Sequence, residues 1–267
     1  MTRSTSASDE ADAVDGLRLP DADHPGTGQR RVWKTAEVVA FAVVRYIVDH
    51  GMRFGDRLPS ESEMLAHYQV SRESLREALR LLEAQGIVSI RRGPSGGPVV
   101  GRAETANLAR TLTLYFQLAG ATYDELLQAW RMLEPLAAEL AAGNVARDRV
   151  RDELGAHLER YDDRGEIAAY VAHSNGLHFA VADLADNRVL GLIIGAVGDI
   201  IRTHVLLRLD PFEMRALIDD DHAAIATAVI DGDGEAARRA MTMHIDRLDP
   251  IYREHWEGDL DDPIEWK

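Results

Sequence analysis

The chain of 267 residues contains no cysteine. This absence excludes disulfide bonds and metal sites built from thiolates. No apolar run reaches the roughly 18 residues that a membrane-spanning helix needs. The N-terminus also lacks the basic-then-apolar pattern of a signal peptide. We therefore expect a cytoplasmic protein that has no membrane partner.

Basic residues are scarce overall, and the net charge is −15. They are concentrated in residues 30–102, which carry 12 Lys and Arg against 8 Asp and Glu, whereas residues 103–267 carry 16 against 31. A local basic excess is typical of a nucleic-acid-binding domain, and the acidic remainder would repel DNA and orient that domain towards it. Residues 1–29 show almost no apolar periodicity, so we expect a disordered tail there.

Within the basic segment, residues 53–100 predict two short helices, a turn and a β-wing. Ser60, with Glu63 three residues later, forms a capping box at the start of the first helix. Ser71 caps the second helix, and Gly86 ends it because glycine readily adopts a left-handed conformation. The residues that follow alternate like a strand and return after a glycine-rich turn. This pattern predicts a winged helix-turn-helix.

The second helix directs Arg72 and Arg76 to one side, four residues apart. Arginines in the first turns of a helix suit the major groove of DNA, where they bridge guanine O6 and N7 or hold phosphates. Glutamates alternate with them, so a solvated helix face is the other interpretation. The agreement of wing, caps and arginines favours DNA binding.

Three motifs, GDRLPSESEMLA, VSRESLREALRLLEAQGIV and RRGPSGG, resemble the winged helix-turn-helix of the GntR family of bacterial regulators. The chain departs from that family at Ser62, a position at which members often carry an arginine. The resemblance implies a double-stranded DNA operator as partner. It also assigns DNA contacts to residues of the second helix and the wing, namely Ser71, Arg72, Ser74, Arg76, Arg92 and Gly93.

From residue 104 onward the pattern is almost purely helical and predicts an antiparallel bundle of about seven helices. They are expected near residues 104–119, 123–142, 147–163, 166–185, 189–207, 213–231 and 234–252. The fold class is thus mainly α. The expected domains are a tail (1–29), the winged helix-turn-helix (30–102), an all-helical domain (103–256) and a loosely held acidic tail (257–267).

Three histidines stand out in the helical half: His178, His222 and His244. Each lies on or beside the apolar stripe of a different helix. Neutral imidazoles that converge inside a bundle suit Zn²⁺ or Ni²⁺. Histidines on apolar faces are also common as ordinary core residues, and spacing alone favours that interpretation.

The pieces RMLEPLAAELAA, LHFAVADLADNRVL and DDHAAIATAVIDGDGEAARRAMTMH are similar to the C-terminal effector domain of the FadR subfamily of GntR regulators. The resemblance implies that His178, His222 and His244 hold a divalent metal, Zn or Ni, at the floor of a ligand cavity. An aspartate four residues before the first histidine usually completes that site. Ser174 stands there in this chain, so water or an effector carboxylate would complete it.

The same resemblance gives Arg131 as a clamp for an effector carboxylate. Glu134, three residues further on, is an alternative partner, because a buried guanidinium needs an anion. Asn175 and Arg202 are further candidates for the effector cavity, with core or surface roles as the alternative. Asp220 and Asp221, beside His222, either support the metal ligands or are solvated charges at a helix start, and the second interpretation is favoured.

The resemblance therefore implies a homodimeric transcription regulator, usually a repressor, that responds to a small carboxylate. Two alternatives stay open. Three histidines with an open coordination position also describe the catalytic zinc of a metalloenzyme, and the metal itself would be the signal in a direct metal sensor. The chain has no His-Glu-x-x-His motif, so we expect that it is not an enzyme.

Overall fold

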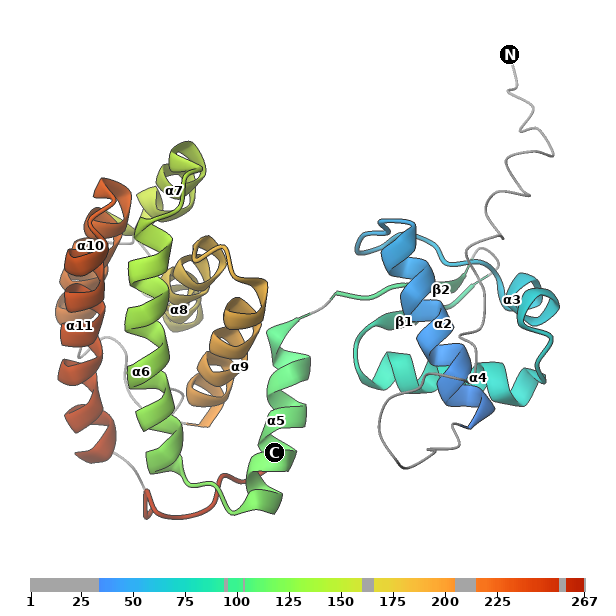
Figure 1. Ribbon diagram of the computed structural model, residues 1–267. Coiled ribbons are helices and arrows are strands. Elements are labelled where there is room, and N and C mark those ends of the chain that lie inside the picture. Colours follow the sequence, from blue (N-terminus) through green and yellow to red (C-terminus); the bar gives the residue numbers. More distant parts are fainter. Residues whose placement is uncertain are drawn as a thin grey trace, which may run out of the picture. The chain divides into compact units, whose positions relative to one another are not determined.

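The computed structural model divides the chain into two compact units, one that ends at Glu104 and one that begins at Thr105 (Figure 1). The expected disordered tail, residues 1–29, lies outside the described residues. Within the described part of the chain, no helix is both long and apolar enough to cross a membrane. The structure describes residues 34–93, 96–102, 104–159, 166–204, 215–254 and 258–266.

The first unit is the winged helix-turn-helix that the sequence predicts. Helix α2 packs against α4, and strands β1 and β2 pair antiparallel to form the wing. The core is apolar and includes the side chains that face inward from all three helices. Its elements are α2 (Thr35–Asp49), α3 (Glu61–Tyr68), α4 (Arg72–Ala84), β1 (Val88–Arg91) and β2 (Gly97–Val100).

Local capping sets the ends of these short helices. The backbone N–H of Ser60 donates to Glu63 Oε2 at 2.6 Å, and the N–H of Glu63 donates to Ser60 Oγ at 3.3 Å, which is a reciprocal capping box. Gln69, with φ of 51°, turns the chain between α3 and α4. Gly86, with φ of 73°, follows the end of α4 in the left-handed region that favours glycine.

The second unit is helical (Figure 1). Helix α6 packs against α8, α9, α10 and α11, and α5 packs against α9. The core gathers the apolar positions of these helices, which confirms the predicted helical architecture. The elements are α5 (Thr105–Ala119), α6 (Tyr123–Ala142), α7 (Arg147–Leu154), a 3-10 turn η1 (Gly155–His157), α8 (Ile167–Leu184), α9 (Arg188–His204), α10 (Arg215–Asp231) and α11 (Gly234–Glu254).

Two features of this unit differ from the sequence prediction. The helix expected over residues 147–163 ends at Leu154 and continues as the 3-10 turn, which begins at a glycine of low helix propensity. The acidic tail is not loosely held over residues 258–266. Ile264 is 1% exposed, and its N–H donates to the carbonyl of Ala121 at 2.8 Å, because this apolar residue reaches the core next to α6.

Candidate functional site

The start of α4 presents the residues that the sequence assigns to DNA. Ser71 caps the helix, and its Oγ accepts a hydrogen bond from the N–H of Ser74 at 3.1 Å. Arg72 and Arg76 are exposed. Ser74 is half-buried, with its hydroxyl 2.9 Å from Ser71 Oγ, so the two hydroxyls serve the helix start together.

A surface hollow lies between α4 and the wing. Arg76, Arg80 and Arg92 line it together with Glu61 and Glu83. Arg76 Nε lies 3.3 Å from Glu61 Oε2, but both side chains are exposed, and an exposed ion pair is weak. Arg76 therefore remains able to exchange this glutamate for a phosphate. Arg80, which is outside the set that the resemblance assigns to DNA, also lines this hollow.

The tip of the wing carries Arg92 and Gly93, and both are exposed. Gly93 has φ of 114°, and Gly97, where β2 begins, has φ of 136°; L side chains rarely adopt either angle. The glycines therefore let the hairpin reverse within a short turn. This keeps Arg92 next to the hollow lined by α4.

The three singled-out histidines meet inside the helical unit. His178 lies on α8, His222 on α10 and His244 on α11, and one ring nitrogen of each lies within 4.8 Å of the others. His222 Nε2 and His244 Nε2 are 3.2 Å apart. His222 is 4% exposed and His244 1% exposed, so they belong to the buried core as well as to the cluster.

Burial keeps the imidazoles of His222 and His244 in the form that binds a metal. It lowers the pKa of His222 well below its ordinary value, and the neighbouring histidines lower it further. Burial also lowers the pKa of His244, although Asp221 acts in the opposite direction. At neutral pH both rings are neutral, and their nitrogen lone pairs are available.

The donor set fits a divalent metal. Two nitrogens that bind one tetrahedral zinc at 2.0–2.1 Å lie about 3.4 Å apart, close to the 3.2 Å between His222 Nε2 and His244 Nε2. Ser174 lies one helical turn before His178, where a carboxylate is usual in the resembled subfamily, and a serine adds no charge. His178, His222 and His244 would therefore hold the metal, and a bound Zn²⁺ or Ni²⁺ would supply a Lewis-acidic positive charge.

A cavity of about 60 Å³ adjoins this cluster. His178 and His244 are among its lining residues, together with Ser174 and Asn175. The Nδ2 amide of Asn175 is buried and has no hydrogen-bond partner within the described part of the chain, so it is a donor available to a bound molecule. The remaining wall is largely aromatic and aliphatic, with Trp130, Tyr170, Phe179, Ile194, Ile201, Ile218, Leu248 and Tyr252.

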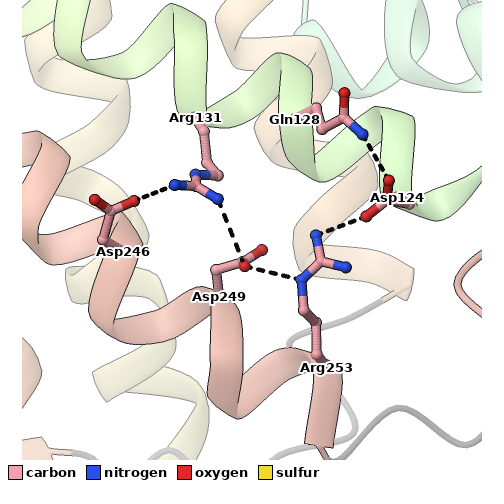
Figure 2. Close-up of polar contacts among 6 residues, drawn as sticks. All are labelled: Asp124, Gln128, Arg131, Asp246, Asp249 and Arg253. Atoms are coloured by element: carbon pink, nitrogen blue, oxygen red, sulfur yellow. Dashed lines mark hydrogen bonds and ion pairs between the residues drawn. The ribbon is translucent and has the colours of Figure 1, made fainter.

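Arg131, which the resemblance gives as an effector clamp, is not among the residues that line this cavity. Figure 2 shows its guanidinium between two aspartates of α11, with Nη2 2.6 Å from Asp246 Oδ1 and Nη1 3.7 Å from Asp249 Oδ2. Arg253 extends the network from Asp249 towards α6. Arg131 is thus an exposed link between α6 and α11. Its partner is also not Glu134, the alternative that the sequence left open.

The geometry of α6 explains why Arg131 lies outside the cavity lining. Successive residues of an α-helix point about 100° apart, and it is Trp130 that lines the cavity. Glu134, one turn further on, also lines it and is 1% exposed. Within the described residues, the cavity lining contains no arginine or lysine. The apolar stripe of α6 predicts that Trp130 faces the inside of the bundle. Only the packing of the helices shows that a cavity lies there.

Arg202 is likewise outside the cavity lining. It is half-buried on α9, and its Nη2 donates to Asp199 Oδ1 at 3.2 Å. Asn175 is therefore the one of the three expected effector contacts that lines the cavity. Asp221, which the sequence left as either a ligand support or a solvated charge, is 8% exposed and lies beside His244.

Both units match known protein families. Residues 35–96 match the model described as "Bacterial regulatory proteins, gntR family", and residues 125–247 match the FCD domain. The chain is 26% identical over 217 residues to "HTH-type transcriptional regulator LutR" of Bacillus subtilis (strain 168), covering 77% of this chain and 95% of that protein. It is 30% identical over 203 residues to "Exu regulon transcriptional regulator" of Escherichia coli (strain K12), covering 72% and 74%.

The fold is also related to that of solved structures. "Streptococcus agalactiae GntR" aligns with a TM-score of 0.59 at 21% identity, covering 82% of this chain and 99% of that chain. At this identity the likeness shows the fold alone. It agrees with a winged helix-turn-helix joined to a helical unit.

Proposed function

The chain belongs to the gntR family of bacterial regulatory proteins and is a DNA-binding transcription regulator with an FCD domain, and from this premise we propose how it acts. It is a repressor of the FadR subfamily whose affinity for operator DNA changes when a small carboxylate binds beside a divalent metal. One observation carries the proposal: His178 and His244 belong both to the histidine cluster and to the wall of the cavity.

In this proposal α4 enters the major groove. Arg72 and Arg76 are exposed on its first turns, where they can contact base edges or phosphates. Arg92 and Gly93 of the wing contact the sugar-phosphate backbone of the DNA. Ser71 holds the start of α4 through its cap, and a helix start offers unpaired N–H groups to a phosphate.

The effector is proposed to be a small acid because of the charge and size of the cavity. No arginine or lysine of the described residues lines it, so a metal held by the histidines would be the positive charge that attracts a carboxylate. Three protein ligands leave a coordination position open. A cavity needs roughly 10–15 Å³ of such volume to hold one water molecule. A cavity of about 60 Å³ therefore suits a molecule of few heavy atoms.

We also propose that the protein binds DNA as a homodimer. A single recognition helix reads few base pairs, and two-fold pairing doubles the readout on a palindromic operator. Size-exclusion chromatography with light scattering tests this, both free and on a selected duplex. A monomer in both states would contradict it.

The experiment that tests the function is an operator-binding titration. A duplex selected from a random pool would be titrated with protein that has been stripped of metal, then with added Zn²⁺ or Ni²⁺, and then with small hydroxy acids, sugar acids and dicarboxylates. We expect an acid to change operator affinity only when the metal is present. An acid response in stripped protein would contradict the metal-dependent mechanism.

Two alternatives are separated by the same assay. If metal alone changes operator affinity and no acid adds to the effect, the protein is a direct metal sensor. A metalloenzyme would turn over the bound acid, which product analysis detects. The relatives reported above are named as transcription regulators, which favours regulation over catalysis.

A further inference from the structure

Two buried carboxylates contact the histidine cluster from behind. Asp221 Oδ2 lies 3.4 Å from His244 Nδ1, and Glu134 Oε2 lies 3.2 Å from His178 Nδ1. Asp221 is 8% exposed and Glu134 is 1% exposed. In both contacts the carboxylate is next to Nδ1, the nitrogen on the opposite side of the ring from Nε2.

This arrangement decides which ring nitrogen is free to bind a metal. A histidine whose Nδ1–H donates to a carboxylate keeps its lone pair on Nε2. For His244 the consequence is visible, because its Nε2 faces His222 Nε2 at 3.2 Å. The carboxylate also makes the imidazole a more basic ligand.

We propose that Glu134 and Asp221 are positioning residues that hold His178 and His244 as Nε2 donors to one divalent metal. This inference rests on the metal site of the proposed function. Neither carboxylate is assigned as a ligand. Each acts through the histidine next to it.

The surroundings of Glu134 support this role. Trp130 Nε1 donates to Glu134 Oε1 at 3.2 Å, whereas Oε2 is buried and has no aligned hydrogen bond in the described part of the chain. His178 Nδ1 is equally without one. A buried carboxylate is costly without a compensating charge. A metal on the far side of His178 would make its Nδ1–H a stronger donor to Glu134.

Asp221 is held from both sides. Arg247 Nη1 forms an ion pair with Asp221 Oδ1, and His244 faces Oδ2. The half-exposed arginine fixes the carboxylate without using the oxygen that faces the histidine. Ser174 stands where an aspartate would add a negative charge to the site. In this proposal the two carboxylates next to the histidines supply negative charge instead.

The test measures zinc affinity by competition with a chromophoric chelator. The variants are Glu134→Gln and Asp221→Asn, which keep side-chain size and remove the charge. Glu139→Gln on α6, whose side chain is 43% exposed, and Asp220→Asn on α10, which is exposed, are matched controls. We expect each positioning variant to bind zinc roughly 10–100-fold more weakly, and each control to stay within about twofold of the wild type.

A second readout separates positioning from direct coordination. The visible absorption of the Co²⁺-loaded protein reports the ligands of the ion. We expect Glu134→Gln and Asp221→Asn to keep the wild-type bands at saturating Co²⁺. Changed bands would make that carboxylate a ligand and overturn its role as a positioning residue. Far-UV circular dichroism checks that both variants fold. If Glu134→Gln does not fold, Asp221→Asn alone tests the positioning role.

Failure of this inference is distinguishable from failure of the proposed function. If the wild type binds zinc, His178→Ala loses it, and both carboxylate variants bind as tightly as their controls, only the positioning roles are overturned. If the wild type binds neither Zn²⁺ nor Co²⁺ at neutral pH, the metal site itself is overturned, and the positioning roles fall with it.

Discussion

The two units of this protein build their sites in opposite ways. The surface between α4 and the wing uses exposed, charged side chains that lie within about thirty residues of one another in the sequence, from Glu61 to Arg92. The cluster of His178, His222 and His244 uses side chains that are buried or nearly so, from three helices. The first site uses elements that follow one another directly in the sequence. The second exists only when the helices pack.

The difference extends to electrostatics. Water surrounds the arginines of α4 and weakens their pairs with glutamates, as for Arg76 and Glu61. Around the histidines burial dominates and lowers the pKa of His222 and His244. We therefore expect substitutions in the first unit to change DNA affinity without unfolding the chain, and substitutions in the second to change metal affinity and stability together.

The largest effect is expected from removal of a clustered histidine. His222→Ala or His244→Ala should lower zinc affinity by roughly 100-fold or more, because two imidazoles without a thiolate hold zinc poorly. Inductively coupled plasma mass spectrometry of dialysed protein measures the occupancy. His67→Ala on α3 is the control and should keep full occupancy. Equal occupancy in all three variants would show that the cluster is not the metal site.

The next effect concerns α4. Arg72→Ala and Arg76→Ala should each weaken operator binding by about 1–3 kcal/mol and relax specificity at one base position. Fluorescence anisotropy with a selected duplex measures the affinity, and thermal unfolding should be unchanged because both side chains are exposed. Arg151→Ala, exposed on α7 in the helical unit, is the control. Undiminished operator affinity in both α4 variants would remove the recognition-helix assignment.

A smaller effect concerns pH. His157 is 7% exposed and stacks on His173 with ring centroids 4.3 Å apart. Burial, together with the nearby rings of His173 and His178, lowers the pKa of His157 to about 4. An unfolded histidine takes up its proton near pH 6.5, so between about pH 6.5 and 4 the unfolded state binds more protons. Stability should therefore fall as the pH drops through this range.

We expect His157 to account for about 1–2 kcal/mol of the loss in unfolding free energy between pH 7 and 5. Urea unfolding in the presence of a chelator, which removes any bound metal, measures it. His157→Gln should show a shallower pH dependence than the wild type over this range. Parallel curves for the two proteins would show that His157 does not stay neutral in the folded state.

A substitution at Ser174 should raise the zinc affinity. Ser174→Asp should tighten zinc binding by about tenfold if its side chain faces the ion, because a carboxylate adds a charged ligand one turn before His178. Ser174→Asn, similar in size but uncharged, is the control and should not tighten it. The chelator competition described above measures both. Weaker binding by the aspartate variant would mean that residue 174 does not face the metal.

The smallest effect is expected at Arg131. Its ion pair with Asp246 is exposed, and Asp249, which is buried, keeps Arg253 as a partner (Figure 2), so Arg131 should contribute less than about 1 kcal/mol to the free energy of unfolding. Arg131→Ala should therefore leave zinc affinity and the acid response unchanged. A lost acid response would restore the effector clamp that the sequence predicts and contradict the cavity described here.

The sequence predicts most of the fold because the signals for it are local. Ser60 with Glu63 and Ser71 with Ser74 cap their helices within four residues, and Gly86 ends α4 as expected. In the helical unit, apolar periodicity predicts the helices closely. It fails where the prediction needs contacts from elsewhere, as for the acidic tail, where Ile264 reaches the core.

The sequence by itself therefore determined the helices, the wing and the exposed arginines of α4, because capping, periodicity and local charge act over a few residues. Only the tertiary structure decided that Trp130 faces the cavity while Arg131 faces Asp246. It also decided that Glu134 lies against His178, although they are on different helices. The rotation and packing of one helix against another set such contacts, and residue spacing along the chain does not contain them.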